Sequence, residues 1–592
     1  MRAYRWQRHR PPGGAFLLCA GRHPAAVRSP ARRWIAALVW LLLLAGPPTA
    51  HGMDMPRAAR PPQQAVASAH PLATAAGMEI LTAGGNAFDA AVAVSATLAV
   101  VEPYSSGIGG GGFWLLHRAR DGRQVMLDGR ERAPLAAHRD LYLDESGDVV
   151  PDLSMDGPLA AAIPGEPAAL THLAEHYGRV PLAESLAPAI RLAETGFAVD
   201  EHYRKMARVR LAVLRQSADA ERIFLHESQV PEPGHVVRQP ELAATLRVLA
   251  ARGRAGFYQG DVAERLVAGV AQAGGIWTLQ DLEQYRVVER DPLVFEYAGM
   301  RVVSAPPPSS GGVALATMLN TLAGFDLQGD DDAVRIHLIV EAMRRAYRDR
   351  AEYLGDPDHV EVPVQRLMHP WYAEGLRAGI RADRATPSAA LPGSVGRLEA
   401  AHTTHFSILD RDGNRVAATL SINYPFGSGF VVPGTGVLLN DEMDDFSAKP
   451  GVPNAYGLVG AEANAIAPGK RPLSSMTPTF VESGRGVALL GTPGGSRIIS
   501  MVLLGILDLA AGEPPSSWVS VPRFHHQYLP DVVQYEPEAF SVPVQETLQA
   551  MGHRLAPLQD RYGNMQAVFW AYGENRVEAA SDPRGIGAAR VE

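Results

Sequence analysis

The stretch HTTHFSILDRDGNRVAATLSINYPFG, residues 402–427, decides the fold. Apolar residues occupy alternate positions from 406 to 408 and again from 416 to 422, and a period of two is typical of strands with one buried face. Between them, residues 410–414 read as a turn in which Gly413 can adopt a positive φ. The pattern predicts a hairpin with strands at 404–409 and 415–422, and it places Thr403 at the mouth of the first strand.

The segment before the hairpin, residues 381–401, is rich in Ala, Pro, Ser and Gly and has no clear period. Such a composition predicts a mobile linker. A flexible linker that runs directly into a buried strand is a poor domain boundary but a good cleavage site. The sequence therefore marks the start of the hairpin as a candidate cleavage site.

Four short motifs of the hairpin form a longer pattern: Thr403-Thr404-His405, Gly413-Asn414, Asn423 and Phe426-Gly427. With them the chain resembles the γ-glutamyltranspeptidases, a family of self-processing hydrolases with an N-terminal nucleophile. One position departs from that family, which usually has Thr-x-Thr in the second strand where this chain has Thr419-Leu420-Ser421. An ordinary Thr/Ser hairpin would be the better interpretation of Thr403 alone, but the combined pattern is specific enough to outweigh it.

The composition is that of an ordinary globular protein. The chain has 592 residues, of which 46% are hydrophobic, so neither disorder nor a multi-span membrane protein is indicated. Residues 1–50 carry eight Arg and no acidic residue; the rest has 47 basic and 63 acidic residues, a formal net charge of −16. A protein this acidic is not expected to bind nucleic acid through a general basic surface. The single cysteine, Cys19, lies in the leading segment, so the rest has no disulfide and no Cys metal ligand.

The leading segment has the layout of a secretory signal. Residues 34–45 form an apolar run behind Arg32-Arg33 and before the small residues at 46–50. The run is too short to span a bilayer comfortably. We expect residues 1–50 to be a signal peptide region and the protein to be exported to the periplasm with no stable membrane anchor. A signal anchor and twin-arginine export are the alternatives, and the residues around the two arginines fit the latter poorly.

A glycine run at 107–112 formally satisfies the G-x-G-x-x-G pattern of dinucleotide sites. Such a site needs a strand before the motif and a helix after it. Here an Ala- and Val-rich segment at 87–101 predicts a buried helix before it, and 113–116 has the character of a strand. We interpret the run as a tight corner inside the core, and the family has the same Gly-rich run.

The segment DGRERAP at 128–134 follows a second short strand. In the family an Arg at this place holds the α-carboxylate of the glutamyl group, and Arg130 is the match. A guanidinium suits that task because its planar fork can bind a carboxylate through two parallel hydrogen bonds. Arg132 is assigned to a charged surface loop.

The acidic segment NDEMDDF at 440–446 lacks the spacing and the sixth-position Gly of an EF-hand calcium loop. In the family this stretch supplies acidic or amide groups to the substrate's α-ammonium, and Glu442 and Asp445 occupy those positions. Together with the amide oxygen of Asn423 they would satisfy the three donors of an ammonium. The next segment, 449–457, matches a lid that covers the pocket in many members and contains Tyr456.

Two later loops complete the resemblance: RPLSSM at 471–476 and GTPGGS at 491–496. It assigns Ser474 and Ser475 to the α-carboxylate, and the backbone amides of Gly494 and Gly495 to an oxyanion hole, where the absence of a Cβ allows close approach. The family also has the PPPSSGG found at 306–312, which predicts a rigid turn into a helix at 313–322 rather than an SH3-type ligand.

Other features are assigned to structure. Asp332 is the expected N-cap of a helix over 333–354, whose Tyr347, Arg350 and Tyr353 are expected to pack or pair structurally. His402 and His405 have H-x-x-H spacing without the Glu of a zincin, and His525 and His526 are adjacent and would point apart in a strand. No metal site is therefore expected, and the resemblance implies no cofactor.

The resemblance implies an α+β fold, a four-layer αββα sandwich of the N-terminal-nucleophile hydrolase type formed by two subunits from one precursor, a large one (51–402) and a small one (403–592). The Thr403 hydroxyl would attack the His402 carbonyl, and the peptide C–N bond between the two residues would break to give an ester and a free Thr403 α-amino group. Water would then hydrolyse the ester. The α-amino group has a reference pKa of about 7.7–8.0, which suits a base near neutral pH. Thr403 would then take the γ-glutamyl group of glutathione or a related compound and pass it to water, an amino acid or a dipeptide. Ser421 stands where the family's Thr hydrogen-bonds the nucleophile's hydroxyl.

Two other functions fit parts of the sequence. One is a related acylase that removes glutaryl side chains from cephalosporins; a glutaryl group has no α-ammonium, so Asn423, Glu442 and Asp445 argue against it. The other is an unprocessed binding protein for γ-glutamyl compounds, which would remain a single chain on a denaturing gel.

Overall fold

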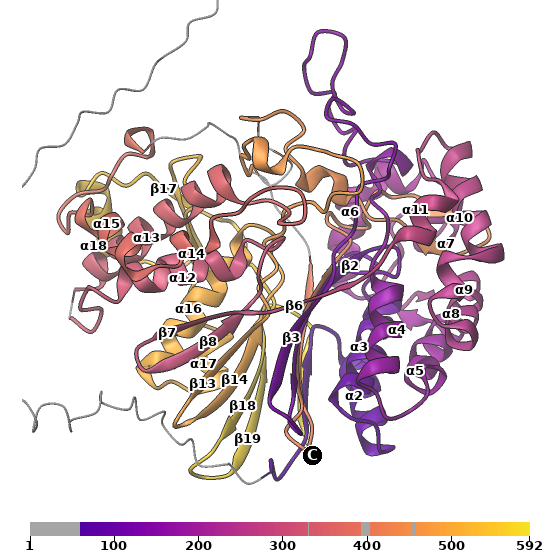
Figure 1. Ribbon diagram of the computed structural model, residues 1–592, viewed down its shortest axis with the longest axis horizontal. Helices are drawn as coiled ribbons and strands as arrows, with labels where there is room; N and C mark the ends of the chain where they lie inside the picture. The colour runs from indigo at the N-terminus through magenta and orange to yellow at the C-terminus, as the bar shows by residue number, and fades with distance from the viewer. Residues whose placement is uncertain (1–59, 330, 392–402, 453, 455–456) are drawn as a thin grey trace, which may run out of the picture. The chain divides into compact units, whose positions relative to one another are not determined.

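Two antiparallel β-sheets lie face to face at the centre of the fold (Figure 1). The computed structural model describes residues 60–329, 331–391, 403–452, 454 and 457–592. The seven-stranded sheet has the order β20 (Ala588–Val591), β1 (Ala65–Ser68), β9 (Thr404–Leu409), β10 (Arg415–Ser421), β2 (Gly111–Arg118), β3 (Arg123–Gly129), β6 (Val288–Arg290). The six-stranded sheet has the order β19 (Arg576–Ser581), β18 (Gln566–Ala571), β14 (Gly486–Gly491), β13 (Thr479–Ser483), β8 (Met300–Ser304), β7 (Leu293–Tyr297).

The predicted hairpin is present as β9 and β10, which pair antiparallel with Leu420 opposite Thr404. The prediction of one buried face was wrong, because every residue of both strands is buried. Apolar and polar residues alternate along the hairpin because one face of its strands packs against the helices and the other face packs against the second sheet. Phe406, Ile408 and Leu420 face the core beneath the first helices, whereas the face that carries His405 turns toward the second sheet, where a Cβ on Gly491 would collide with the His405 ring.

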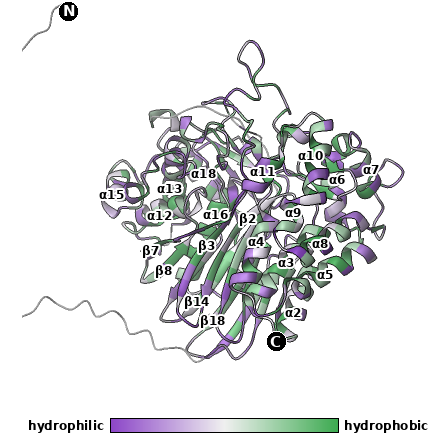
Figure 2. Cartoon of the chain, turned by 45° about the vertical axis from the view of Figure 1, so that its right-hand side comes forward, coloured by the Kyte–Doolittle hydropathy of each residue, from purple (hydrophilic) through white to green (hydrophobic). Residues whose placement is uncertain are grey.

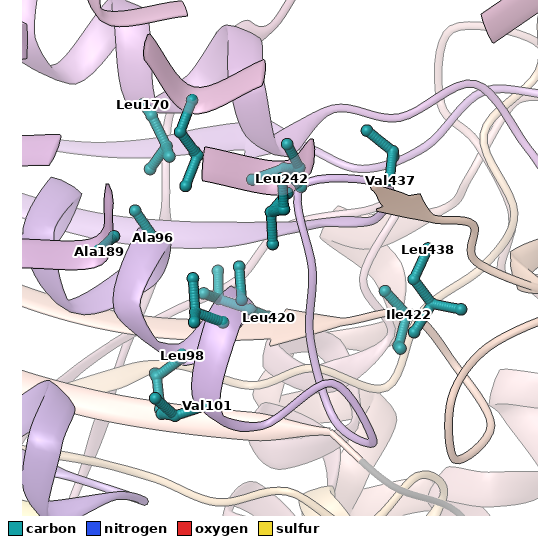
Figure 3. Close-up of a cluster of buried hydrophobic side chains, with 14 of the residues drawn as sticks. Ala96, Leu98, Val101, Leu170, Ala189, Leu242, Leu420, Ile422, Val437 and Leu438 are labelled. Carbon is teal, nitrogen blue, oxygen red and sulfur yellow. The ribbon is translucent and has the colours of Figure 1, made fainter. Parts of the chain in front are cut away.

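One helical layer covers the outer face of the seven-stranded sheet (Figure 1). Its centre is α3, which spans Ala87–Val101 as predicted, is buried along its whole length and is largely hydrophobic in Figure 2. In Figure 3 the α3 side chains Leu98 and Val101 lie near Leu420 of the hairpin, whereas Ile422 lies beside Leu438 in the same core. The packing of α3 on Leu420 fixes the end of α3, and with it Glu102, beside the start of β9. The first helical region comprises α2 (Pro71–Thr82), α3, α4 (Glu166–His176), α5 (Leu182–Thr195), α6 (Glu201–Leu214), α7 (Ala218–Phe224), α8 (Pro240–Arg252), α9 (Ala255–Tyr258), α10 (Gly260–Gln272) and α11 (Leu279–Gln284).

A second helical layer covers the six-stranded sheet and shares one core with the space between the sheets (Figure 1). It consists of α12 (Gly311–Leu322), α13 (Asp332–Tyr353), α14 (Val364–Leu367), α15 (Pro370–Ala378), α16 (Arg497–Ala511), α17 (Pro515–Trp518) and α18 (Val542–Ala550). The turn into α12 after the Pro-rich motif is as predicted. The N-cap of α13 is Asp331 instead of Asp332, because the Asp331 side chain accepts hydrogen bonds from the amides of Ala333 and Val334.

Shorter strands complete the described part: β4 (Phe197–Ala198) pairs with β5 (Val236–Val237), β11 (Val431–Val432) with β12 (Val437–Leu438), and β15 (Phe524–His525), β16 (Val533–Tyr535) and β17 (Leu555–Pro557) form a small sheet. The glycine run leads directly into strand β2, so the nucleotide-site context is absent there. No helix within these described residues is both long and apolar enough to cross a membrane. The predicted signal region, residues 1–50, lies outside them.

Candidate active site

Thr403 lies immediately before β9, at the edge of the space between the two sheets. Its side chain is buried, and its Oγ1 accepts a hydrogen bond from the Gly494 amide at 3.1 Å. Gly494 and Gly495 belong to the loop between β14 and α16, and their φ angles of 139° and 54° lie in the region that favours glycine. The two sheets thus bring a hydroxyl and a backbone N–H donor together from positions 91 residues apart.

A cavity opens in front of Thr403, and most of the predicted site residues line it. Its wall includes Arg130, Thr403, Ser421, Asn423, Asp445, Ser474, Ser475 and Gly495. Two other predicted residues that the structure describes lie elsewhere: Glu442 is fully buried against Arg130, and Gly494 lines an adjoining cavity. The structure therefore gathers residues from five separate sequence segments around one hydroxyl.

Arg130 is the cationic centre of this cavity and is almost completely buried. It forms ion pairs with Glu442 and Asp445 through different guanidinium nitrogens, and its Nη1 also lies 3.3 Å from Glu131. Its Nε donates to the carbonyl of Pro472 at 3.2 Å. The group assigned to a carboxylate and the groups assigned to an ammonium are therefore in direct contact.

Three carboxyl groups compete for this one guanidinium. Burial lowers the pKa of Arg130, but Glu442 and Asp445 outweigh it and leave that pKa above its usual value. Burial raises the pKa of Glu442 to about 7 even though Arg130 opposes the shift. Burial and the neighbouring Glu442 charge also raise the pKa of Glu131 well above its usual range. One cation faces two fully buried carboxyls and one half-buried carboxyl, so the cluster as a whole favours the protonated form more than free carboxyls do.

Residues of the Pro-rich motif at 306–312 hydrogen-bond to the backbone of the serine loop at 474–475. Ser309 Oγ donates to the Met476 carbonyl at 2.6 Å and Ser310 Oγ to the Ser474 carbonyl at 2.7 Å. Arg350 on α13, assigned to packing or pairing by sequence, donates to Ser310 Oγ at 3.0 Å and to Ser475 Oγ at 3.2 Å. Arg350 thus positions a serine of the cavity wall and brings a second buried cation near it. Nothing in its local sequence distinguishes it from other helical arginines.

Ser421, the residue that departs from the family pattern, is the last residue of β10. Its Oγ accepts a hydrogen bond from the Asn423 amide at 2.7 Å, and its hydroxyl lowers the pKa of Glu442 against the larger effect of burial. Asn423 has a positive φ of 74°, and its Nδ2 donates to the Asp441 carbonyl at 3.0 Å. The end of β10 therefore links the Thr403 side of the cavity to its acidic side.

A comparison with known families identifies this arrangement. The Gamma-glutamyltranspeptidase family matches residues 73–591, nearly the whole of the part that follows the leading segment. The chain belongs to the γ-glutamyltranspeptidase family. It is 43% identical over 531 residues to the glutathione hydrolase proenzyme of Pseudomonas sp. (strain A14), covering 88% of this chain and 92% of that protein. It is 41% identical over 550 residues to the glutathione hydrolase proenzyme of Escherichia coli (strain K12), covering 91% and 94%.

Among solved structures, a cephalosporin acylase from Bacillus halodurans is similar, with a TM-score of 0.78 and 29% identity over 90% of this chain and 96% of that one. γ-Glutamyltranspeptidases and these acylases are N-terminal-nucleophile hydrolases. The mixed α/β fold with several sheets is therefore the fold of that superfamily, and the resemblance inferred from the hairpin is confirmed.

Two predicted residues of this family member lie outside the described residues: His402, at the proposed cleavage site, and Tyr456, in the proposed lid. The flanks of the lid segment do reach the cavity. Asn454 Nδ2 lies 3.4 Å from Asp445 Oδ1, and the amide of Leu458, which lines the cavity, donates to Asn454 Oδ1 at 3.1 Å.

The histidines that were weighed as metal ligands make other contacts. His405 Nδ1 lies 2.8 Å from Thr419 Oγ1, and burial lowers the pKa of His405 to about 3, so its ring is neutral. His525 bonds to Ser500 and His526 to Asp531. The described residues contain no group of three or more His, Cys, Asp or Glu placed to hold a metal ion. Arg132 is half-buried and donates to the Gly469 carbonyl at 2.7 Å, so the surface-loop assignment was wrong.

Glu102 is a residue near Thr403 that the sequence did not point to. It follows α3, is buried, and accepts a hydrogen bond from Thr404 Oγ1 at 2.7 Å. Burial raises the pKa of its carboxyl to about 7, against the Thr404 bond, which lowers it. The only signal in the sequence was its place at the end of a buried helix before a proline.

Glu102→Gln should stabilise the fold at pH 8 and have little effect at pH 4. The native pKa of about 7 lies above the unfolded value near 4.5, so the native state keeps a proton that the unfolded state loses. The parent therefore loses stability as pH rises from about 4.5 to 7, by on the order of 3 kcal/mol, and the neutral Gln removes that loss. Denaturant midpoints from pH 4 to 8 test this, best in an uncut Thr403→Ala background. A difference between Gln and Glu that is constant with pH would contradict the prediction.

Proposed function

We propose that this protein is a self-processing γ-glutamyl transferase and hydrolase that cleaves the γ-glutamyl amide of glutathione and related compounds. The observation that carries the proposal is the contact of Arg130 with Glu442 and Asp445 in the cavity that Thr403 lines. An α-amino acid bears its carboxylate and its ammonium on one carbon. The adjacent cationic and anionic groups of the cavity complement the carboxylate and the ammonium of a glutamyl group. A glutamyl group bound in this way can place its γ-carbonyl next to the Thr403 hydroxyl.

Thr403 is the proposed nucleophile of both stages. In processing, its hydroxyl attacks the His402 carbonyl, and the His402–Thr403 C–N bond breaks with the proton passing to the Thr403 nitrogen. Water then hydrolyses the resulting ester, which gives a large subunit, 51–402, that ends in a carboxylate and a small subunit, 403–592, with a free α-amino group and hydroxyl. The two subunits together would form the four-layer αββα sandwich. The amide of Gly494 already donates to Oγ1, which supports an oxyanion role for the amides of Gly494 and Gly495 when charge develops next to that atom.

In turnover, the freed α-amino group accepts the proton of the Thr403 hydroxyl as that oxygen attacks the γ-carbonyl. The C–N bond breaks, the amine leaves with the proton, and the glutamyl ester is passed to water, an amino acid or a dipeptide. Arg130, Ser474 and Ser475 hold the α-carboxylate, and Asn423, Glu442 and Asp445 hold the α-ammonium. Tyr456 would cover the bound group as part of a lid. No cofactor takes part in these steps.

The experiment that tests the function is an assay with γ-glutamyl anilide, with and without a dipeptide acceptor, on protein whose two fragments have been sequenced. The smaller fragment should begin Thr403-Thr404-His405. The leading segment should be absent from the mature protein, which we expect in the periplasm. A single intact chain without turnover would favour the binding-protein alternative.

A cephalosporin acylase is the second candidate because a solved structure of one is similar over most of the chain. The acidic groups around Arg130 count against a glutaryl substrate, since a glutaryl group brings no ammonium to balance them. Turnover of a glutaryl anilide faster than the γ-glutamyl anilide would reverse this assignment.

Ser421→Ala should slow processing and turnover clearly, whereas Ser421→Thr should change both only modestly. Thr keeps the hydroxyl that accepts from the Asn423 amide and adds only a methyl group that narrows χ1. A neutral hydrogen bond contributes about 0.5–1.5 kcal/mol, so the Ala variant should lose about 2- to 13-fold in kcat/KM. Parent-like rates in Ser421→Ala would reduce Ser421 to a strand residue.

A further inference from the structure

A second cavity, of about 460 Å³, also has Thr403 in its wall. Among the described residues, Thr403 is the only one that lines both cavities, and the two glycines divide between them: Gly495 lines the first and Gly494 the second. A nucleophile that transfers an acyl group needs the acyl part on one side and the amine part on the other. The second cavity is therefore placed to take the amine part.

One cation in the wall of this second cavity is not balanced by an acidic partner. The other cations are paired: Lys205 with Asp560 at 2.6 Å, Arg561 with Glu538 at 3.2 Å, and Arg584 with Glu536 at 2.7 Å. Arg497 has no ion pair with any described carboxylate. It is the first residue of α16 and lies one turn beyond Gly494, whose carbonyl accepts a hydrogen bond from the Arg497 amide at 3.1 Å.

The Arg497 guanidinium is held in place by neutral groups. Gln534 Oε1 accepts hydrogen bonds from Nε at 3.2 Å and from Nη2 at 2.9 Å, and the guanidinium carbon lies 4.9 Å from the centre of the Tyr562 ring. Its Nη1 has no hydrogen-bond partner in the described part of the chain. A fixed guanidinium with one donor edge available is suited to an incoming carboxylate.

We propose that Arg497 binds the carboxylate of the amine partner, an amino acid or short peptide, on the opposite side of Thr403 from the glutamyl group. This inference rests on the proposed function. The peptide that leaves glutathione and the amino acid or dipeptide that accepts the glutamyl group are the same kind of molecule, an amine that carries a terminal carboxylate. Because acceptance reverses departure, one subsite serves both. A dipeptide spans at most about 7 Å, so its carboxylate stays within one arginine side chain of the reacting nitrogen.

The test compares amine partners with and without a carboxylate in Arg497→Gln. Loss of a charge-assisted hydrogen bond should lower kcat/KM for glutathione by about tenfold or more, mainly through KM. Hydrolysis of γ-glutamyl anilide, whose leaving amine is uncharged, should stay close to that of the parent. With the anilide as donor, the KM for glycylglycine should rise by about the same factor, and the KM for glycylglycinamide should not. The glutathione arm reports the leaving peptide and the glycylglycine arm reports the acceptor.

Arg497→Lys and Arg561→Gln are the matched controls. Lys keeps the charge and should recover part of the loss, while Arg561 lines the same cavity but is already paired with Glu538 and should behave like the parent. If Arg497→Gln fails to fold, the two acceptors can still be compared in the unmutated protein. There the KM for glycylglycinamide should be about tenfold above the KM for glycylglycine. Equal losses for glutathione and the anilide, or equal KM values for the two acceptors, would overturn the assignment. A parent that hydrolyses neither donor would instead refute the proposed function.

Discussion

Thr403→Ala should leave one uncut chain with no measurable γ-glutamyl turnover. The substitution removes the hydroxyl proposed for both processing and transfer, and no other described hydroxyl is bonded to the Gly494 amide. Loss of a nucleophile costs on the order of 10⁴-fold or more in kcat, the largest effect expected of any single change here. A denaturing gel, N-terminal sequencing and the anilide assay measure it. Thr403→Ser, which keeps the hydroxyl, is the control and should still give two fragments.

Recovery of the same small fragment from Thr403→Ala would show that an outside protease makes the cut. That result would remove the self-processing step but would leave the transfer step open. Turnover in an uncut Thr403→Ala chain would remove both.

Arg130→Ala should cripple γ-glutamyl turnover while Thr403 processing continues. A charge-assisted contact with the substrate's carboxylate contributes about 1.5–3 kcal/mol, so kcat/KM should fall by roughly 10- to 150-fold. Processing does not use that carboxylate, and its substrate is the chain itself. The measurements are kcat/KM for the anilide and the fraction of cut chain.

The same substitution should also destabilise the fold, because it leaves Glu131, Glu442 and Asp445 without their cation in a buried site. Breaking a buried pair in this way costs about 3–5 kcal/mol, so the melting temperature should fall as well. Arg132→Ala is the matched control: its guanidinium donates to the Gly469 carbonyl and not to a carboxylate. Unchanged kcat/KM in Arg130→Ala would move the carboxylate site elsewhere.

The sequence could predict the hairpin from its alternating apolar residues, and helix α3 from an Ala- and Val-rich run bounded by Asn86 before it and Glu102-Pro103 after it. It could not predict that both faces of the hairpin are buried, because the second sheet comes from residues 293–304 and 479–581. Hydrophobic alternation along one strand contains no information about a layer built elsewhere. The N-cap of α13 was missed by one residue because two adjacent aspartates are equally good caps.

The candidate site was predictable where a motif carries it. Residues such as Arg130 and Asp445 stand in recognisable segments, and the structure brings them together as one cavity wall. Glu102 and Arg350 were not predictable, because each acts through a long-range contact, with Thr404 and Ser475 respectively. The ion pairs of Arg130 with Glu442 and Asp445 could not be predicted from the sequence either. The family resemblance assigns each of these residues a role toward a bound substrate, and it says nothing about their contacts with one another when no substrate is bound.

Strand β1 from the start of the described chain lies between β9 and β20 from its last third, and β8 likewise pairs with β13. A cut before Thr403 would therefore produce two interleaved polypeptides and not two separable bodies. Neither piece could leave without breaking ladder hydrogen bonds in both sheets at once. The cut would release a chain end for chemistry and leave the architecture intact, so the fragments should migrate as one particle in any non-denaturing solvent, and dilution should not part them.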